Sequence, residues 1–215
     1  MLKVWGRRSA FNVQKVMWLI GELGLEHAHT TLGGDAGGLD DPAFLTMNPH
    51  GRVPVIEDNG TVVWESHAIL RYLAAVYGDT SLWPDDQAER SWADRWMDWT
   101  QSSLQPTFLN GIFWAYFRTP EAQRDWPEIR NNQALSNQYF MRIEEALEGR
   151  DYLGGERLGL GDIPAGTHLY RYFGMDLERP ALPRVEAWYE RLRNRAAYRE
   201  HVMVPFKDLK GKTSY

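Results

Sequence analysis

A hydroxyl and a side-chain amide stand close to the start of the first predicted helix. Ser9 lies in the loop just before that helix, and Asn12 lies at or near its first turn. The first N–H groups of a helix lack intrahelical partners and carry the positive end of the helix dipole, so an anion is stabilised there. A hydroxyl at this place can donate a hydrogen bond to a thiolate and so lower the pKa of a bound thiol from its free value of about 8.5. The alternative is that Ser9 or Asn12 simply caps the helix.

A second candidate segment is Asn-Pro-His-Gly-Arg-Val-Pro, at residues 48–54. Two prolines around a glycine predict a fixed, turn-rich entry into a strand, and the Val53-Pro54 bond is of the kind that adopts the cis form at modest cost. A cis bond would turn the main-chain N–H and C=O of Val53 outward, where a peptide ligand could pair with them as an added strand does. The alternative is an ordinary trans proline at the start of a strand.

A third candidate segment is Trp-Glu-Ser-His-Ala-Ile-Leu, at residues 64–70. Ser66 and the unpaired N–H groups at the start of a helix form a cradle for a carboxylate, while Glu65 beside it could receive an ammonium group. The head group of an amino acid needs both features. The alternative is a helix cap with an exposed acidic neighbour.

The elements that must position these segments alternate between strand and helix. The periodicity of residues 1–78 predicts strand, helix, strand, irregular helix, strand, strand and helix, which is the thioredoxin-like layout. We expect Ser66 to be the N-cap of the last helix. The predicted ranges are Leu2–Trp5, a helix from near Asn12 to Gly24, residues 26–31, a glycine-rich irregular segment at Gly33–Gly38, Val53–Glu57, Thr61–Trp64 and Ser66–Gly78.

The rest of the chain shows no strand pattern after a linker at residues 79–85, so residues 86–215 are expected to form an all-helical domain. Its helices are predicted at residues 86–117, 121–149, 162–175, 184–194 and 196–202. A tryptophan stripe with spacing i, i+4 and i+7 falls on one face of the first of these helices. We expect this stripe, formed by Trp92, Trp96 and Trp99, to pack between helices or subunits rather than to line a ligand pocket.

Composition narrows the classes of function. The 215 residues carry a net charge of −5 without a basic run, which argues against a nucleic acid partner. Cysteine is absent, so any thiol chemistry must use a borrowed thiol. The apolar stretch Val13–Leu25 is interrupted by polar residues at helical spacing, unlike a signal peptide, and no segment approaches the roughly 20 apolar residues of a membrane span. The six histidines show no metal-ligand spacing. We therefore expect a cytoplasmic protein without a metal.

Taken together, the three segments resemble the glutathione-site motifs of cytosolic, bacterial-type glutathione transferases. The matching residues are Ser9 before the first helix, Asn48-Pro-x-Gly-Arg-Val-Pro54, and Glu65-Ser66-x-Ala-Ile-Leu70. Their order and spacing match in register, and a linker and a helical domain follow. The resemblance covers essentially the whole chain and is strongest over residues 1–78. It implies a thioredoxin-like glutathione-binding domain of the α/β class, followed by an all-α domain that binds an electrophile.

The resemblance also implies a role for each matching residue. Ser9 is similar to the hydroxyl that donates to the glutathione thiolate in the serine-type classes, and Asn12 is the alternate donor. Val53 is implied to pair with the cysteinyl backbone of glutathione, beside a cis Pro54. Glu65 and Ser66 resemble the anchors of the γ-glutamyl group. The glycyl carboxylate is implied to meet Arg52 or His50.

The activity that the resemblance implies is attack of the glutathione thiolate on a hydrophobic electrophile, by proximity rather than by covalent catalysis. Glutathione is the co-substrate, no metal is needed, and the family is usually homodimeric. The electrophile pocket is expected to use the aromatic segment Asn110–Arg118, in particular Phe113, Trp114 and Phe117. The sequence does not name the electrophile.

Other functions use the same scaffold. A glutathione-dependent isomerase, lyase or dehalogenase would share the thiolate site and differ in the pocket. A non-catalytic binding protein would be expected to lose its thiol partner or its anchors, yet Ser9, Pro54, Glu65 and Ser66 are all present. A cysteine-type transferase or a glutaredoxin-like reductase is disfavoured more firmly than these alternatives, because the chain contains no cysteine.

One departure from the family pattern lies in the helical domain. Many relatives carry Ser/Thr-x-x-Asp at the start of the buried helix, whereas this chain has Gly159-Leu-Gly-Asp162. The hydroxyl half of that capping box is missing. We expect Asp162 still to accept the local N–H bonds, with a modest loss of stability at the helix start.

Overall fold

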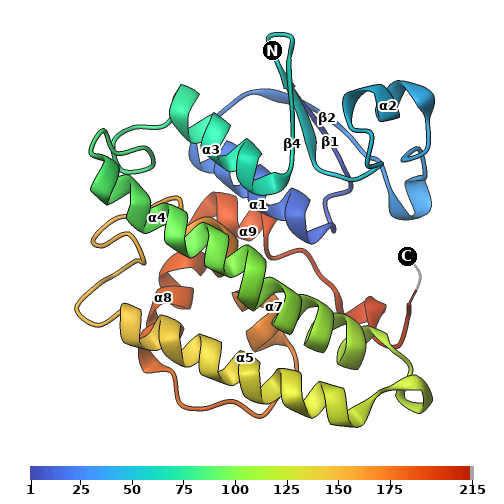
Figure 1. Ribbon diagram of the computed structural model, residues 1–215, viewed down its shortest axis with the longest axis vertical. Coiled ribbons are helices and arrows are strands. Elements are labelled where there is room, and N and C mark those ends of the chain that lie inside the picture. The colour runs from blue at the N-terminus through green and yellow to red at the C-terminus, as the bar shows by residue number, and fades with distance from the viewer. Residues whose placement is uncertain (214–215) are drawn as a thin grey trace. The chain divides into compact units, whose positions relative to one another are not determined.

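The computed structural model describes residues 1–213 of the chain (Figure 1). The chain divides into two compact units. The first contains residues 1–78 and 196–204, and the second contains residues 79–195 together with the segment that begins at residue 205.

A four-stranded sheet forms the centre of the first unit. Its strands are β1 (Leu2–Trp5), β2 (His27–Thr30), β3 (Val55–Asp58) and β4 (Thr61–Trp64), and they lie in the order β2-β1-β3-β4. β1 runs parallel to β2 and antiparallel to β3, which pairs antiparallel with β4 through a tight turn at Asn59 and Gly60. Both turn residues have positive φ, 49° and 89°, as the sequence of this turn predicts. The thioredoxin-like prediction is confirmed.

Helices flank this sheet on both sides. They are α1 (Phe11–Glu22), the short turn η1 (Gly34–Ala36), α2 (Pro42–Met47), α3 (Ser66–Tyr77) and α9 (Ala196–His201). Figure 1 shows α1 and α3 together on one side of the strands and α2 beyond the other side.

The helix α9 belongs to the first unit, although residues 196–202 were expected within the helical domain. The reason is packing against α1. The ring of Tyr198 meets Trp18 edge to face at 4.8 Å, and both rings are fully buried. A Cβ at Gly21 would lie 2.8 Å from the Cβ of Ala197, so only glycine allows α9 to come this close.

The second unit is helical, as predicted. Its elements are α4 (Gln87–Trp99), η2 (Thr100–Arg118), η3 (Glu121–Gln123), α5 (Trp126–Ala146), α6 (Asp162–Thr167), α7 (Leu169–Gly174), α8 (Pro183–Arg193) and η4 (Lys207–Leu209). The predicted helix over residues 86–117 is formed by α4 and η2, which follow each other without a break. In η2 the bonding has the wider π-helical pattern, and Pro106 lies inside it. A wider turn gives the proline ring room beside the carbonyl of the preceding turn.

Asp162 stabilises the start of α6 without the missing hydroxyl. The carboxylate is fully buried and accepts the backbone N–H groups of Leu153 and Gly159, each at 2.8 Å. Burial raises the pKa of Asp162 to about 6, against the opposing effect of these hydrogen bonds. The expectation that this aspartate accepts local N–H bonds is therefore confirmed.

Candidate functional site

The three candidate segments lie in the first unit, and a close approach at Gly6 joins two of them. Gly6 follows β1 and leads into the loop that contains Ser9. Its φ is +143°, and a Cβ there would lie 3.0 Å from the Cβ of Val53 and 2.5 Å from a methyl group of Val13. Only glycine lets the loop before α1 pass against Val53. The predicted thiol-activating loop is thus adjacent to the predicted peptide-binding residue.

Neither Ser9 nor Asn12 is the N-cap of α1. The N-cap is Ala10, which offers no side-chain hydrogen bond, and the helix begins at Phe11. Ser9 and Asn12 are both half-buried. The side-chain oxygen of Asn12 is buried and accepts no hydrogen bond in this structure. Because buried polar atoms are seldom left unsatisfied, this oxygen is a group that a ligand can complete.

The segment at residues 48–54 contains the expected cis bond, between Val53 and Pro54. The strand β3 begins only at Val55, two residues later than predicted, and Val53 lies outside the sheet register. The later start has a physical reason, since Pro54 has no N–H to give to a sheet ladder. The half-buried Val53 keeps its main-chain groups outside that ladder.

Asn48 shapes the loop before Val53, a role that the sequence reasoning missed. It is 2% exposed, its amide donates to the carbonyl of Arg52 at 2.8 Å, and its oxygen accepts the N–H of His50 at 3.1 Å. The signal was present as an Asn-Pro pair directly after α2, because asparagine commonly bonds to the backbone of the turn that it begins. His50 and Arg52 themselves are exposed, and the ring of His50 meets Trp64 edge to face at 5.1 Å.

The third segment begins α3 in an unusual backbone conformation. Glu65 has φ 68° and ψ 119°, a region that side chains other than glycine rarely adopt. The expected N-cap was Ser66, but the N-cap is Glu65, one residue earlier, and its side chain makes no capping bond. Ser66 is instead the first helical residue and is 4% exposed. Such a conformation costs about 1 to 3 kcal/mol and is typical of binding sites.

A buried lysine lies against the first turn of α3, and sequence reasoning missed it. Lys15 of α1 is 1% exposed, and its Nζ lies 3.1 Å from Nε2 of His67, which is also buried. Desolvation lowers the pKa of Lys15 to about 7, and the charge of Glu65 opposes that shift. The ring of Phe11, one turn earlier on the same face, lies 5.0 Å from the ammonium. The contact between Lys15 and His67 holds the beginning of α3 against α1.

The predicted electrophile residues belong to the second unit. Phe113 and Phe117 are 1% and 8% exposed, and their rings stack at 5.6 Å with Phe206 against the edge of both. They are therefore part of the core of this unit. Trp114 is half-buried and lies under the guanidinium of Arg118 at 4.1 Å. Of these three predicted residues, Trp114 has the ring surface that a ligand could contact.

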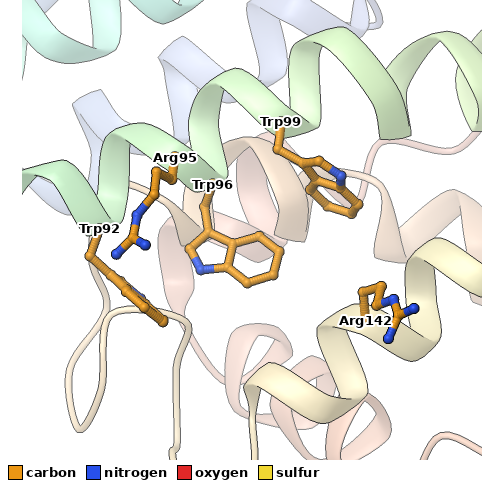
Figure 2. Close-up of a pocket in the computed structure, with 5 residues that line it drawn as sticks. All are labelled: Trp92, Arg95, Trp96, Trp99 and Arg142. Atoms are coloured by element: carbon orange, nitrogen blue, oxygen red, sulfur yellow. The ribbon is translucent and has the colours of Figure 1, made fainter.

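The tryptophan stripe lines a pocket of about 240 Å³ in the second unit (Figure 2). Figure 2 shows the three indole rings projecting from α4, with an arginine of α5 facing them. Trp96 and Trp99 meet edge to face at 5.3 Å, and Trp92 donates its indole N–H to the carbonyl of Leu153 at 2.7 Å. The lining residues are Trp92, Arg95, Trp96, Trp99 and Arg142.

The described part of the chain shows neither a metal-binding cluster nor a helix that could span a membrane. Within residues 1–213, no group of three or more His, Asp or Glu side chains is placed to hold a metal ion. None of the helices in the same range is both long enough and apolar enough to cross a membrane.

Comparison with known proteins agrees with this geometry. Residues 1–75 match the glutathione S-transferase N-terminal domain, and residues 104–196 match the C-terminal domain. The chain is 36% identical over 207 residues to glutathione S-transferase GstB of Escherichia coli K12, covering 95% of this chain and 99% of that protein. It also resembles the crystal structure of a theta class glutathione S-transferase from Xanthomonas axonopodis pv. citri with glutathione bound. That match has a TM-score of 0.89 and 45% identity, and it covers 95% of this chain and 98% of the other. The chain therefore belongs to the glutathione S-transferase family.

Proposed function

We propose that this chain is a serine-type glutathione transferase, which binds glutathione in its first unit, favours the thiolate form and directs it at a hydrophobic electrophile. The observation that carries this proposal is the convergence at the starts of α1 and α3. Gly6 brings the Ser9 loop against Val53, and Lys15 joins α1 to the residues that follow Glu65. The glutathione bound in the Xanthomonas relative supports the same ligand here.

Glutathione would be held at both ends and in the middle. The main chain of Val53, which the sheet leaves outside its ladder, pairs with the cysteinyl residue of the tripeptide. The carboxylate of Glu65 receives the γ-glutamyl ammonium, and the N–H groups at the start of α3 with Ser66 receive the neighbouring carboxylate. The exposed Arg52, or His50 beside it, meets the glycyl carboxylate.

The residues at the start of α1 activate the thiol of glutathione. The hydroxyl of Ser9 donates to the sulfur, and the positive end of the helix dipole stabilises the thiolate further. Asn12 is the alternate donor, because it lies in the first turn of α1 and its side-chain NH2 group can donate to a thiolate. No metal takes part in this step. We place the reaction in the cytoplasm, where glutathione is kept reduced.

The electrophile would be bound with the help of the half-buried Trp114, which Phe113 and Phe117 support from the core of the second unit. The substrate that binds beside Trp114 decides whether the enzyme catalyses conjugation or a related isomerase, lyase or dehalogenase reaction, all of which use the same thiolate site. A non-catalytic member of the family would bind glutathione and catalyse none of these reactions.

The protein would act as a homodimer, with a second copy covering the tryptophan pocket of the second unit. Tryptophan and arginine are enriched at the centres of protein interfaces, and this pocket presents both. Light scattering tests this assembly. Trp96→Arg should shift the mass from two chains toward one, whereas Trp126→Ala, at a tryptophan that is 38% exposed elsewhere in this unit, should not.

The decisive experiment is calorimetry of glutathione binding, together with a conjugation assay that uses a generic aryl halide. Ser9→Ala should lose mainly turnover, and Glu65→Ala should lose mainly affinity. Ser91→Ala, at an exposed serine of α4, is the matched control and should behave as the native protein does. Tight glutathione binding without conjugation would favour an isomerase, a lyase or a ligand carrier. No binding would contradict the proposed function.

A further inference from the structure

A buried ammonium in the first unit enters the function proposed so far only as a contact between α1 and α3. Lys15 is 1% exposed and lies on the face of α1 that meets α3. Burying an ammonium is unfavourable unless its charge and its hydrogen bonds are matched, and an apolar side chain of similar length would avoid this penalty. A lysine at this place therefore needs a reason other than stability.

The contacts of Lys15 connect it to the predicted γ-glutamyl anchor. Its Nζ lies 3.1 Å from Nε2 of His67. An ammonium has only donors, so a bond between the two requires that His67 carry its proton on Nδ1 and accept through Nε2. His67 is 3% exposed and stands two residues after Glu65. The Lys15–His67 contact therefore ties the first turn of α3 to α1.

The residue that this contact holds is the strained one. Glu65 keeps φ at 68° although it is not glycine, and its side chain makes no capping bond that would favour this conformation. A strained conformation persists only when the surroundings fix it. Two surroundings are present here: the helix that starts at Ser66, and the buried cation whose pKa responds to the charge of Glu65.

We propose that Lys15 and His67 are positioning residues for glutathione, which hold the carboxylate of Glu65 where it receives the γ-glutamyl ammonium. This inference rests on the proposed function. Neither side chain touches the ligand in this scheme. Lys15 acts through its charge on Glu65 and through His67, which fixes the turn that carries Glu65.

The test is steady-state kinetics on Lys15→Met, which keeps the length of the side chain and removes the charge. The KM for glutathione should rise about tenfold, while kcat stays within about threefold, because a misplaced anchor weakens ground-state and transition-state binding alike. Lys3→Met is the matched control. Lys3 is in β1 of the same unit, pairs with Glu57 at 2.8 Å and should leave both constants unchanged.

A glutathione analogue that lacks the γ-glutamyl amino group separates positioning from a general disturbance of the site. The native protein should bind it more weakly than glutathione, and Lys15→Met should change its KM by less than about twofold, since the ammonium that Glu65 receives is gone. An equal rise in KM for both ligands would overturn the inference, and so would an unchanged KM for glutathione.

His67→Phe provides a second route to the same answer. It keeps a ring of similar size, removes the acceptor for Lys15 and should raise the KM for glutathione in the same way. In the double variant Lys15→Met/His67→Phe, the rise in KM for glutathione should not exceed the rise in the more affected single variant, because both substitutions break the same Lys15–His67 contact. Additive effects would overturn the inference. Failure of the native protein to bind glutathione would contradict the proposed function instead, so the two failures are distinguishable.

Discussion

An acidic side chain stands at the start of α6 and another at the start of α3, and the two are used in opposite ways. At the start of α6, Asp162 is fully buried and both of its oxygens accept backbone N–H groups at 2.8 Å. At the start of α3, Glu65 is exposed, has φ 68° and makes no capping bond. The carboxylate of Asp162 thus bonds to backbone groups of its own chain, whereas the carboxylate of Glu65 faces solvent, where a ligand can reach it. The hydrogen-bond partners of a carboxylate at a helix start therefore indicate its role better than its position does.

The largest expected effect is on stability, from Asp162→Ala. This change leaves the N–H groups of Leu153 and Gly159 buried without an acceptor, and each such donor is unfavourable by about 1 to 3 kcal/mol. We expect a loss of about 3 kcal/mol in the free energy of unfolding, measured by urea denaturation.

The control for this loss is Asp151→Ala. Asp151 is 57% exposed and pairs with Arg191 on the surface of the same unit. An exposed ion pair contributes only about 0 to 1 kcal/mol. Equal losses for the two aspartates would break the contrast between the two helix starts, because Asp162 would then be an ordinary surface carboxylate in energetic terms.

The next effect concerns Glu65 and should appear in binding rather than in stability. Glu65→Gln removes the charge and keeps the strained backbone, whereas Glu65→Gly removes the charge and relieves the strain. Both should raise the KM for glutathione about tenfold or more, because a charge-assisted bond is lost in each. Only Glu65→Gly should also stabilise the fold, by about 0.5 to 2 kcal/mol in thermal or urea unfolding.

A glycine variant that is less stable than the native protein would show that the backbone of Glu65 is not strained in the sense used here. A glycine variant that binds glutathione normally would remove Glu65 from the site altogether.

How far the sequence predicts these features depends on the range of the interactions behind them. The Asn59-Gly60 turn and the succession of strands and helices along residues 1–78 follow from local signals and were predicted correctly. The cis bond before Pro54 was implied only by the resemblance to glutathione transferases, because the local residues also allowed a trans proline. The contact between Lys15 and His67 joins residues that are 52 positions apart, so no local pattern contains it.

Packing also decides which face of a helix is buried. Phe113 and Phe117 were predicted as pocket residues together with Trp114, but the first two stack in the core while the third keeps an accessible ring. Similarly, the short helix α9 has an apolar face whose partner cannot be read from its own residues, and it packs on α1 through Tyr198. Aromatic residues at helical spacing predict that a helix face is buried, but only the folded structure shows which element that face packs against.

A smaller effect distinguishes the two candidate thiolate donors at the start of α1. Ser9→Ala should lower kcat by about tenfold and move the pH profile of kcat/KM toward the free thiol, since one hydrogen bond to a thiolate is lost. Asn12→Ala should change both much less. The measurement is the rate of conjugation between about pH 6 and 9, the range around the free thiol pKa. A larger loss from Asn12→Ala would assign the donor to the side-chain NH2 group of Asn12.

The last effect is a dependence of stability on pH that belongs to Lys15. Its pKa is about 7 in the folded protein and 10.5 in the unfolded chain, so between these values the unfolded chain binds more protons. The contribution of Lys15 therefore becomes more favourable as the pH rises from 7 toward 10.5, by up to about 1.4 kcal/mol per pH unit. Lys15→Met lacks this group, so it should be more stable than the native protein at pH 7, and the difference in urea unfolding should shrink at pH 9. A difference that does not change with pH would mean that Lys15 stays charged in the fold, with Glu65 and His67 compensating the buried ammonium fully. That outcome would make the pair a stabilising contact like Asp162, and α3 would then begin as α6 does, with its charge satisfied within the chain.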